Sequence, residues 1–150
     1  MPLVVIAGPT ASGKTAAAIE AAKKLGGEII SADSMQIYRS LDIGTAKPTK
    51  DELNSARHHL IDIREPDEAY SVADFIADAN AAVDAILARG KIPIVCGGTG
   101  LYISSLVSGI TLSSDKTDEE LRKSLYEEYE KNGIEPLLTE IREKDEEYAK

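Results

Sequence analysis

The sequence has little cysteine, and this scarcity excludes two classes of small protein. Its single thiol, Cys96, can form no internal disulfide and has no second thiol with which to build a metal cluster. The simplest interpretation of Cys96 is a small buried hydrophobic residue. We therefore expect a cytoplasmic protein in a reducing compartment, with a fold that depends on the packing of its core.

Long hydrophobic runs are also absent. The apolar segment at residues 3–7 is far shorter than the roughly 20 residues that a transmembrane helix needs. No basic region with a cleavage site accompanies this segment, so we predict no signal peptide and no membrane partner.

Positive charge is in short supply. The chain carries 17 basic and 26 acidic side chains, and residues 115–150 alone contain 13 acidic and 7 basic ones. Proteins that bind nucleic acid usually present a basic surface, and this composition does not indicate one. Aromatic residues do not indicate one either, because Tyr126, Tyr129 and Tyr148 have the spacing of helical core positions, which favours packing over base stacking.

The first 33 residues read as a strand, a helix and a strand. Residues 3–7 are β-branched and apolar and are followed by Gly8-Pro9, which is typical of a buried parallel strand. An Ala-rich helix is expected at residues 13–25, and a second strand at residues 28–32. These elements form a βαβ unit.

The alternation of strands and helices continues to about residue 107. A short strand is possible at residues 60–63, and Ser71 with Asp74 forms a capping box for a helix that ends at Arg89-Gly90. A buried strand at residues 92–96 and a short helix at residues 101–107 follow. We predict an α/β fold with a mostly parallel sheet covered by helices on both faces, and ligands on such sheets bind beyond the carboxyl ends of the strands.

Composition changes near Ser113, where the apolar pattern gives way to charged amphipathic segments. Two helices are expected, at residues 118–132 and 136–148, joined by Asn132-Gly133. The predicted organisation is thus an α/β core at residues 1–113 and a helical hairpin at residues 114–150.

A phosphate-binding motif lies between the first predicted strand and the first predicted helix. It matches G-x-x-x-x-G-K-[ST], the P-loop pattern, and this position confirms the structural context that the motif requires. Backbone N–H groups and the helix N-terminus would bind phosphate, Lys14 would neutralise its charge, and the Thr15 hydroxyl could hold Mg²⁺. We expect a di- or triphosphate to bind the eight residues Gly8, Pro9, Thr10, Ala11, Ser12, Gly13, Lys14 and Thr15.

Asp33 follows the second predicted strand and should lie beside the phosphates. Such a carboxylate can coordinate Mg²⁺ through water or accept a proton from a nucleophile. An aspartate in this position is also common as a turn former or helix cap, and the sequence alone does not separate these roles. The strand at residues 92–96 leads into Gly97-Gly98-Thr99-Gly100 rather than into an acidic residue. Asp33 is therefore the best-placed acid, and Thr99 offers a hydroxyl in a loop that a substrate could approach, unless the loop is a plain turn.

His58 and His59 are adjacent on a segment that is expected to be extended. Neighbouring side chains on a strand point to opposite sides, so the two make a poor chelating pair. At most one of them is expected to be functional.

Six blocks of this sequence, in the same order, resemble the tRNA dimethylallyltransferases, also called isopentenyltransferases. The blocks are residues 8–15, 30–39, 42–48, 58–62, 70–75 and 97–102. The resemblance implies a P-loop NTPase-like fold followed by the start of a helical insertion that grips the anticodon arm. It also implies that this sequence corresponds to the N-terminal half of the family.

The activity implied by the resemblance is transfer of a dimethylallyl group from dimethylallyl diphosphate to the exocyclic amine of an adenosine next to the anticodon. Pyrophosphate is released with Mg²⁺ present, and the enzyme is expected to act on tRNA as a monomer. In such enzymes the residues that match Asp33, Thr10 and Lys14 are catalytic, and Asp33 acts as the general base. Contacts to tRNA are implied for Asp33, Ser34, Met35, Gln36, Thr99 and Arg122, although Arg122 could also be a solvated charge on a helix face.

Two alternatives remain open at the level of sequence. A P-loop small-molecule kinase would bind ATP at the same loop and use Asp33 to deprotonate a hydroxyl, but it needs arginines that close over the phosphates, and residues 115–150 are net acidic. The other alternative is an inactive fragment that binds a diphosphate without catalysing a reaction.

Overall fold

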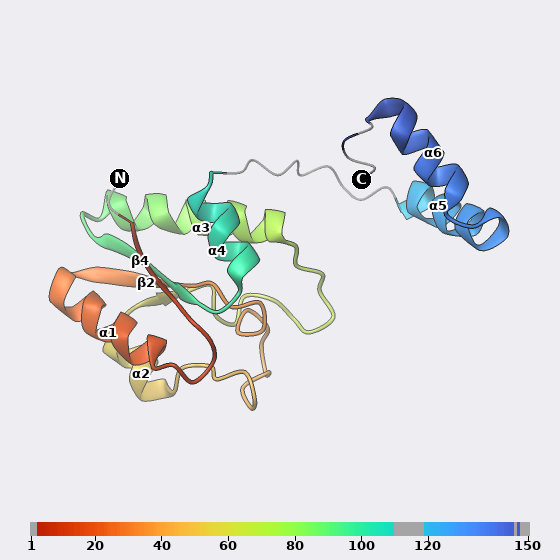
Figure 1. Ribbon diagram of the computed structural model, residues 1–150. Helices are drawn as coiled ribbons and strands as arrows, with labels where there is room; N and C mark the ends of the chain where they lie inside the picture. The colour runs from red at the N-terminus through yellow and green to blue at the C-terminus, as the bar shows by residue number, and fades with distance from the viewer. Residues whose placement is uncertain (1–2, 110–118, 146, 148–150) are drawn as a thin grey trace. The chain divides into compact units, whose positions relative to one another are not determined.

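The computed structural model describes residues 3–109, 119–145 and 147 of the chain (Figure 1). The chain divides into two compact units, residues 1–113 and residues 114–150, and each is described by itself.

The first unit is built on a sheet of four parallel strands in the order β1-β4-β2-β3. The strands are β1 (Val4–Ala7), β2 (Gly27–Ser31), β3 (His58–His59) and β4 (Ile92–Gly97). In the register of the sheet Ala7 pairs with Gly97, and Ser31 pairs with Cys96. The carboxyl ends of three strands therefore meet at one edge, where the P-loop and Asp33 begin.

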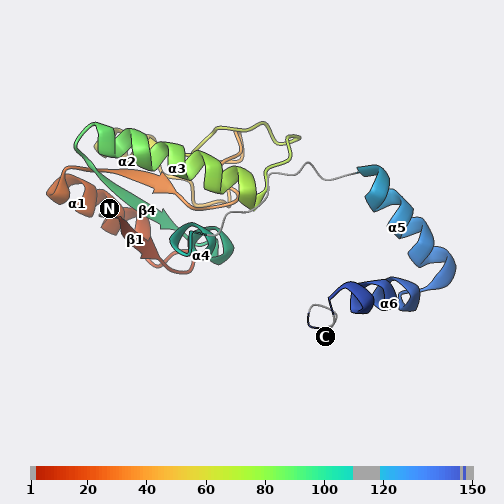
Figure 2. The same cartoon turned by 90° about the horizontal axis from the view of Figure 1, so that it is seen from above.

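Helices cover both faces of this sheet, as predicted. Figure 1 shows α1 and α2 on one face, and α3 and α4 on the other; Figure 2 shows the same elements from above. Their bounds are α1 (Lys14–Leu25), α2 (Lys50–Ser55), α3 (Val72–Ala88) and α4 (Gly100–Val107).

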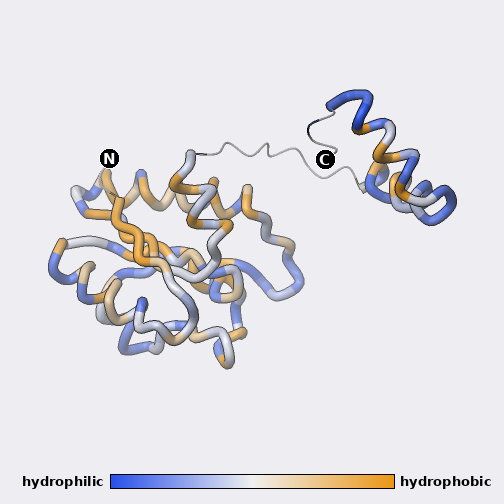
Figure 3. Tube along the Cα trace, viewed as in Figure 1, coloured by the Kyte–Doolittle hydropathy of each residue, from blue (hydrophilic) through white to orange (hydrophobic). Residues whose placement is uncertain are grey.

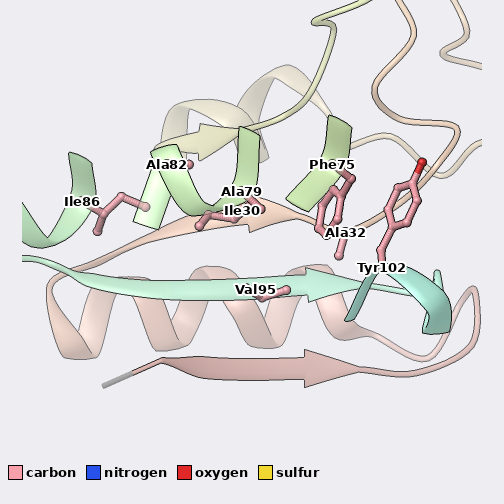
Figure 4. Packing of buried hydrophobic residues seen from close by; sticks show 8 residues of the cluster. All are labelled: Ile30, Ala32, Phe75, Ala79, Ala82, Ile86, Val95 and Tyr102. Carbon is pink, nitrogen blue, oxygen red and sulfur yellow. The ribbon is translucent and has the colours of Figure 1, made fainter. Parts of the chain in front are cut away.

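Two apolar clusters hold the helices to the sheet. On one face Phe75 of α3 stacks on Tyr102 of α4, with ring centroids 4.3 Å apart, above Ile30 and Val95 (Figure 4). On the other face α1 packs against the strands through Ala18, Ile19 and Ala22. Figure 3 shows the hydrophobic strands at the centre of the unit. Burial of these side chains fixes the strand ends that carry the site.

Capping residues define where two of the helices begin. The capping box of Ser71 and Asp74 at the start of α3 is present as predicted. A second capping box, formed by Thr49 and Glu52, starts α2, a helix that we did not predict. Its T-x-x-E pattern is the sequence signal that could have located this helix.

The predicted strand at residues 60–63 is wrong. Leu60 and Asp62 have φ angles of 61° and 55°, which no extended strand allows, so β3 ends at His59. The chain instead turns toward the segment after β2, where Ile63 N donates to Ile37 O at 2.8 Å. This segment therefore supports the site rather than the sheet.

The second unit is a hairpin of α5 (Glu119–Asn132) and α6 (Glu135–Lys144), joined through Gly133 at a φ of 74°. Helix α6 ends at Lys144, short of the predicted residue 148; residues 146 and 148–150 lie outside the described residues.

The tyrosines of the hairpin are not core residues within this unit. Tyr126 and Tyr129 are 60% and 49% exposed, so the expectation that they pack in a core is wrong, and Tyr148 lies outside the described residues. With Arg122, Leu125 and Leu137 they line a surface groove. A pair of helices has one mutual face, which leaves much of its apolar surface uncovered.

In the described residues no helix is both long enough and apolar enough to cross a membrane.

Candidate active site

The P-loop folds as a tight turn between β1 and α1. Ser12 N donates to Pro9 O at 3.4 Å, while Ala11 and Gly13 adopt positive φ angles of 64° and 82°. No side chain caps α1, so the amides of its first turn are not occupied by a capping group. This is the arrangement in which a helix N-terminus binds an anion.

Lys14 lies across the same turn. Its Nζ donates to Pro9 O at 2.9 Å, and a Cβ added at Gly98 would lie only 3.8 Å from that nitrogen. The ammonium is thus held at the mouth of the loop by one backbone carbonyl, which leaves it two further N–H donors for a phosphate oxygen.

A cavity of about 320 Å³ joins the P-loop to the end of β2. Its lining comprises residues 10–16, Asp33, Gln36, Ala46, Glu52, Cys96 and Gly97. Thr10, Lys14 and Asp33, which we predicted to be catalytic, therefore line one cavity. Its volume is in the range of small-ligand sites.

Residues 33–36, here called the acceptor segment, are fixed by hydrogen bonds at both of their ends. Asp33 Oδ1 accepts from Met35 N at 3.0 Å, which orients the carboxylate. Ser34 N donates to Thr99 Oγ1 at 3.0 Å. Thr99 thus lies beside the acceptor segment and ties it to the start of α4, whereas Met35 is 48% exposed.

Gln36 builds the wall of the cavity opposite the P-loop. Its Nε2 donates to the carbonyl oxygens of Thr45 and Ala46, at 3.3 and 3.0 Å. Its Oε1 accepts from Ser31 Oγ at 3.0 Å. Both polar atoms of this side chain are engaged, in three hydrogen bonds, so the wall is preorganised before any ligand binds.

Lys47 stabilises the chain segments around this wall without lining the cavity. Its side chain is 5% exposed, and its Nζ donates to Tyr38 O, Asp42 Oδ1 and Asp62 Oδ1 at 2.9, 2.6 and 2.7 Å. Burial alone would lower the pKa of Lys47, but the two carboxylates outweigh it and raise the pKa above its ordinary value. With three donors used, this cation supports the site and does not bind phosphate.

The cavity contains the oxygen donors that Mg²⁺ prefers. Thr15, Asp33 and Glu52 all contribute to its lining. No group of three or more His, Cys, Asp or Glu side chains able to hold a metal occurs in the described ranges. Such a group is not needed here, because Mg²⁺ is usually bound through one or two protein oxygens together with substrate phosphates. The residues therefore fit a diphosphate-bound Mg²⁺.

Glu52 is the residue of this cavity that sequence reasoning missed. It lies on α2, where hydrogen bonds from the backbone and the hydroxyl of Thr49 lower the pKa of its carboxyl group. The carboxylate is therefore ionised near neutral pH at the edge of the phosphate site.

Gly97, the last residue of β4, and Gly98, the residue after it, differ in the space that a side chain would have. A Cβ at Gly97 would lie 2.1 Å from Ala32 O, so only glycine allows β4 and β2 to meet at this edge. At Gly98 the nearest atom, Gly8 O, would lie 3.4 Å away, which is ordinary contact. The need for glycine at Gly97 is thus a matter of strand packing.

The two histidines lie in different surroundings, as the alternation of a strand predicts. His59 Nε2 lies 2.7 Å from Glu28 Oε2 near the amino ends of the strands, whereas His58 Nδ1 lies 2.8 Å from Ala56 O. Burial lowers the pKa of His58, against the opposing effects of the Ala56 carbonyl and Glu52. Arg122, also predicted as a site residue, belongs to α5 of the second unit.

The sequence and the structure are both similar to those of known proteins. The sequence profile of the IPP transferase family matches residues 36–150. A tRNA dimethylallyltransferase from Symbiobacterium thermophilum is 49% identical over 145 residues, which cover 97% of this chain and 46% of that protein.

Two solved structures resemble the whole chain. The tRNA isopentenylpyrophosphate transferase of Bacillus halodurans matches with a TM-score of 0.73 and 43% identity, over 99% of this chain and 49% of that one. A eukaryotic dimethylallyltransferase that acts on tRNA matches with a TM-score of 0.78 and 32% identity, over 99% and 37%. These neighbours bear out the predicted P-loop-like α/β fold.

The chain spans about half the length of the curated relatives that it matches. The profile nevertheless covers more than half of this chain, and it extends from the acceptor segment to the last residue. The protein therefore belongs to the IPP transferase family.

Proposed function

We propose that this chain binds dimethylallyl diphosphate at the P-loop and takes part in transferring its dimethylallyl group to tRNA. The acceptor would be the exocyclic amine of an adenosine next to the anticodon. One observation carries the proposal: the Lys14 ammonium and the Asp33 carboxylate line the same cavity of about 320 Å³. A donor diphosphate and an acceptor amine need these two kinds of group on opposite sides of the reacting carbon.

The P-loop would stabilise the leaving group. As the carbon–oxygen bond breaks, the electron pair leaves with pyrophosphate, so negative charge grows on the phosphate oxygens. The amides at the start of α1 and the Lys14 ammonium are donors aimed at the place where this charge develops. Thr10, at the rim of the cavity, can add a hydroxyl donor.

Asp33 would remove the proton from the acceptor. The amine nitrogen forms a bond to the carbon and must then lose one hydrogen, which the carboxylate of Asp33 accepts. Because the amide of Met35 binds Oδ1, the orientation of this carboxylate is set before the substrate arrives. No phosphoryl group is transferred in this scheme.

Mg²⁺ would be held by Thr15, with Asp33 or Glu52 as further oxygen donors, and when bound it would neutralise the charge of the diphosphate. The acceptor segment and Thr99 would contact the target nucleotide, since Met35 is exposed and Ser34 is bonded to Thr99. Arg122 on α5 would provide a contact to an RNA phosphate.

The test is to incubate the chain with dimethylallyl diphosphate, Mg²⁺ and an anticodon stem-loop RNA, and to measure the mass of the RNA. We expect the RNA to gain one dimethylallyl group. Asp33→Asn should lower the rate by about a hundredfold or more, because a positioned general base contributes at least this much. Asp84→Asn, on an exposed position of α3, is the matched control and should leave the rate unchanged.

Each alternative has its own result. A near-normal rate in Asp33→Asn would remove Asp33 from the proposed role. Pyrophosphate binding by the chain without measurable RNA affinity or turnover would favour the inactive fragment. Transfer of phosphate from ATP to a small hydroxyl compound would favour the kinase.

A further inference from the structure

A second, smaller cavity of about 20 Å³ adjoins the diphosphate cavity. Its polar lining comes from Thr15, Ser31, Gln36 and His58, and Thr15 and Gln36 also line the diphosphate cavity. A cavity must offer about 10–15 Å³ to hold one water molecule, so this one has room for a single water.

His58 brings an acceptor to this cavity. Its Nδ1 lies 2.8 Å from Ala56 O, and because a carbonyl oxygen only accepts, Nδ1 carries the hydrogen. In the neutral ring Nε2 is then a bare acceptor. This nitrogen is buried and has no hydrogen-bond partner in the described part of the chain. A buried acceptor without a donor is destabilising, so a donor is expected there.

Three of the neighbouring side chains cannot supply that donor. Ser31 has one hydroxyl hydrogen and donates it to Gln36 Oε1 at 3.0 Å. Gln36 has two amide hydrogens, and both go to the carbonyl oxygens of Thr45 and Ala46. The Cys96 thiol, which also lines the cavity, donates its hydrogen to Lys14 O at 3.6 Å. Of the polar side chains that line the cavity, the Thr15 hydroxyl remains.

We propose that one water molecule occupies this cavity, donates a hydrogen bond to His58 Nε2 and accepts one from the Thr15 hydroxyl. Its second hydrogen can go to Ser31 Oγ, which has free acceptor capacity because its own hydrogen is used. Buried waters of this kind make about three hydrogen bonds, which is the number that this site offers.

The water has a consequence for the Thr15 hydroxyl. A hydroxyl that binds a cation must turn a lone pair toward the cation, so its hydrogen must go elsewhere. The chain from Thr15 through the water to His58 directs that hydrogen away from the diphosphate cavity. His58 is thus a positioning residue for the metal ligand, and this inference depends on the proposed function only through the bound Mg²⁺.

The first test is ¹⁵N NMR of the histidine rings in the unmodified chain at neutral pH. We expect His58 to be the Nδ1–H tautomer, with Nε2 hydrogen-bonded as an acceptor, and a water in the cavity in a high-resolution crystal structure. An Nε2–H tautomer, or a dry cavity, would overturn the proposal. This measurement needs no ligand and stands even if the proposed activity is wrong.

The second test compares His58→Leu with His58→Gln, in which the side-chain oxygen lies near the place of Nε2. Calorimetric titration with pyrophosphate should show affinity about tenfold weaker for His58→Leu in the presence of Mg²⁺ and nearly unchanged in EDTA, because groups behind a metal ligand typically change metal affinity by this factor. His58→Gln should retain most of the affinity.

His59→Leu is the matched control, because the ring of His59 contacts Glu28 at the other edge of the sheet. The pyrophosphate affinity of this variant should respond to Mg²⁺ as that of the parent chain does. An equal loss with and without Mg²⁺ in His58→Leu, or no loss at all, would contradict the proposal. If the unmodified chain fails to bind pyrophosphate, the proposed function fails, and the tautomer result then decides the water site alone.

Discussion

The charged side chains at the two edges of the same parallel sheet differ in whether they are paired with one another. At the carboxyl edge Lys14 and Asp33 form hydrogen bonds with backbone groups, Pro9 O and Met35 N, and both side chains line an open cavity. At the amino edge Glu28 is 1% exposed, and its Oε2 lies 2.7 Å from both Arg89 Nη2 and His59 Nε2.

This difference separates binding from stability. The charges at the amino edge are satisfied by one another, so they fix β2, β3 and the start of β4 in place. The charges at the carboxyl edge await a ligand and contribute little to the folded state on their own. The proposed function therefore uses the edge where charge is left unsatisfied.

The largest expected effect comes from Glu28→Gln at the amino edge. The substitution weakens the hydrogen bonds that the buried carboxylate accepts from Arg89 and His59. A hydrogen bond to a charged group is worth about 1.5–3 kcal/mol, so the free energy of unfolding should fall by about 3 kcal/mol. Urea denaturation followed by circular dichroism measures this change. Pyrophosphate affinity should stay the same, and a parallel loss of affinity would mean that the two edges are not independent.

The pH dependence of stability tests the same carboxylate. Burial alone would raise the pKa of Glu28, but hydrogen bonds from Arg89 and His59 and the charges of Arg89 and Arg57 lower it from 4.5 to about 2. Because the folded-state pKa is the lower one, Glu28 stabilises the fold fully above pH 4.5 and loses this contribution as the pH falls to about 2. The stability difference between the parent and Glu28→Gln should shrink across this window; a constant difference would contradict the assignment.

Lys14→Met should show the reverse pattern at the carboxyl edge. A charged hydrogen bond to phosphate is worth about 2 kcal/mol, so pyrophosphate affinity should fall about thirtyfold in calorimetric titration. The free energy of unfolding should hardly change, since Lys14 donates to one exposed carbonyl. Lys24→Met, at an exposed position of the same helix, is the control and should bind pyrophosphate normally.

The features that were predictable from sequence are those set by neighbours along the chain. The P-loop needs eight consecutive residues, and the capping box of α3 needs Ser71 and Asp74 alone. The apolar runs located β1 and β4 for the same reason, and β4 is buried as predicted. The prediction that β1 is buried is wrong, because β1 is an edge strand of the sheet and Val5 is 38% exposed. Asp33 was placed beside the P-loop because parallel strands end at a common edge.

The features that were missed depend on contacts between distant segments. Leu60 and Asp62 take positive φ angles because the chain must turn to bond with the segment after β2, and no local signal records this. Lys47 looks like a surface charge in the sequence but is buried by Asp42 and Asp62. Tyr126 is likewise exposed because α6 leaves its side chain uncovered, and this depends on how the two helices pack.

The cluster at the amino edge is the extreme case. Glu28 sits next to the apolar pair Ile29-Ile30 in β2, and its cations come from Arg57, just before β3, and from Arg89, the C-cap of α3. Spacings of this size are invisible to periodicity, which compares residues only a few positions apart. The structure was needed to show that this charge is buried.

The smallest expected effect comes from a comparison of two cations in that cluster, by the stability that each contributes. Arg57 Nε lies 3.6 Å from Glu28 Oε2, and its side chain is 62% exposed, so solvent screens the interaction. Arg57→Met should therefore lower the free energy of unfolding by less than about 0.5 kcal/mol in urea denaturation. Arg89→Met should lose considerably more, because Arg89 donates from two nitrogens to the same carboxylate. Equal losses in the two variants would mean that the summed positive charge stabilises Glu28, and the amino edge would then be a diffuse field rather than a set of paired hydrogen bonds.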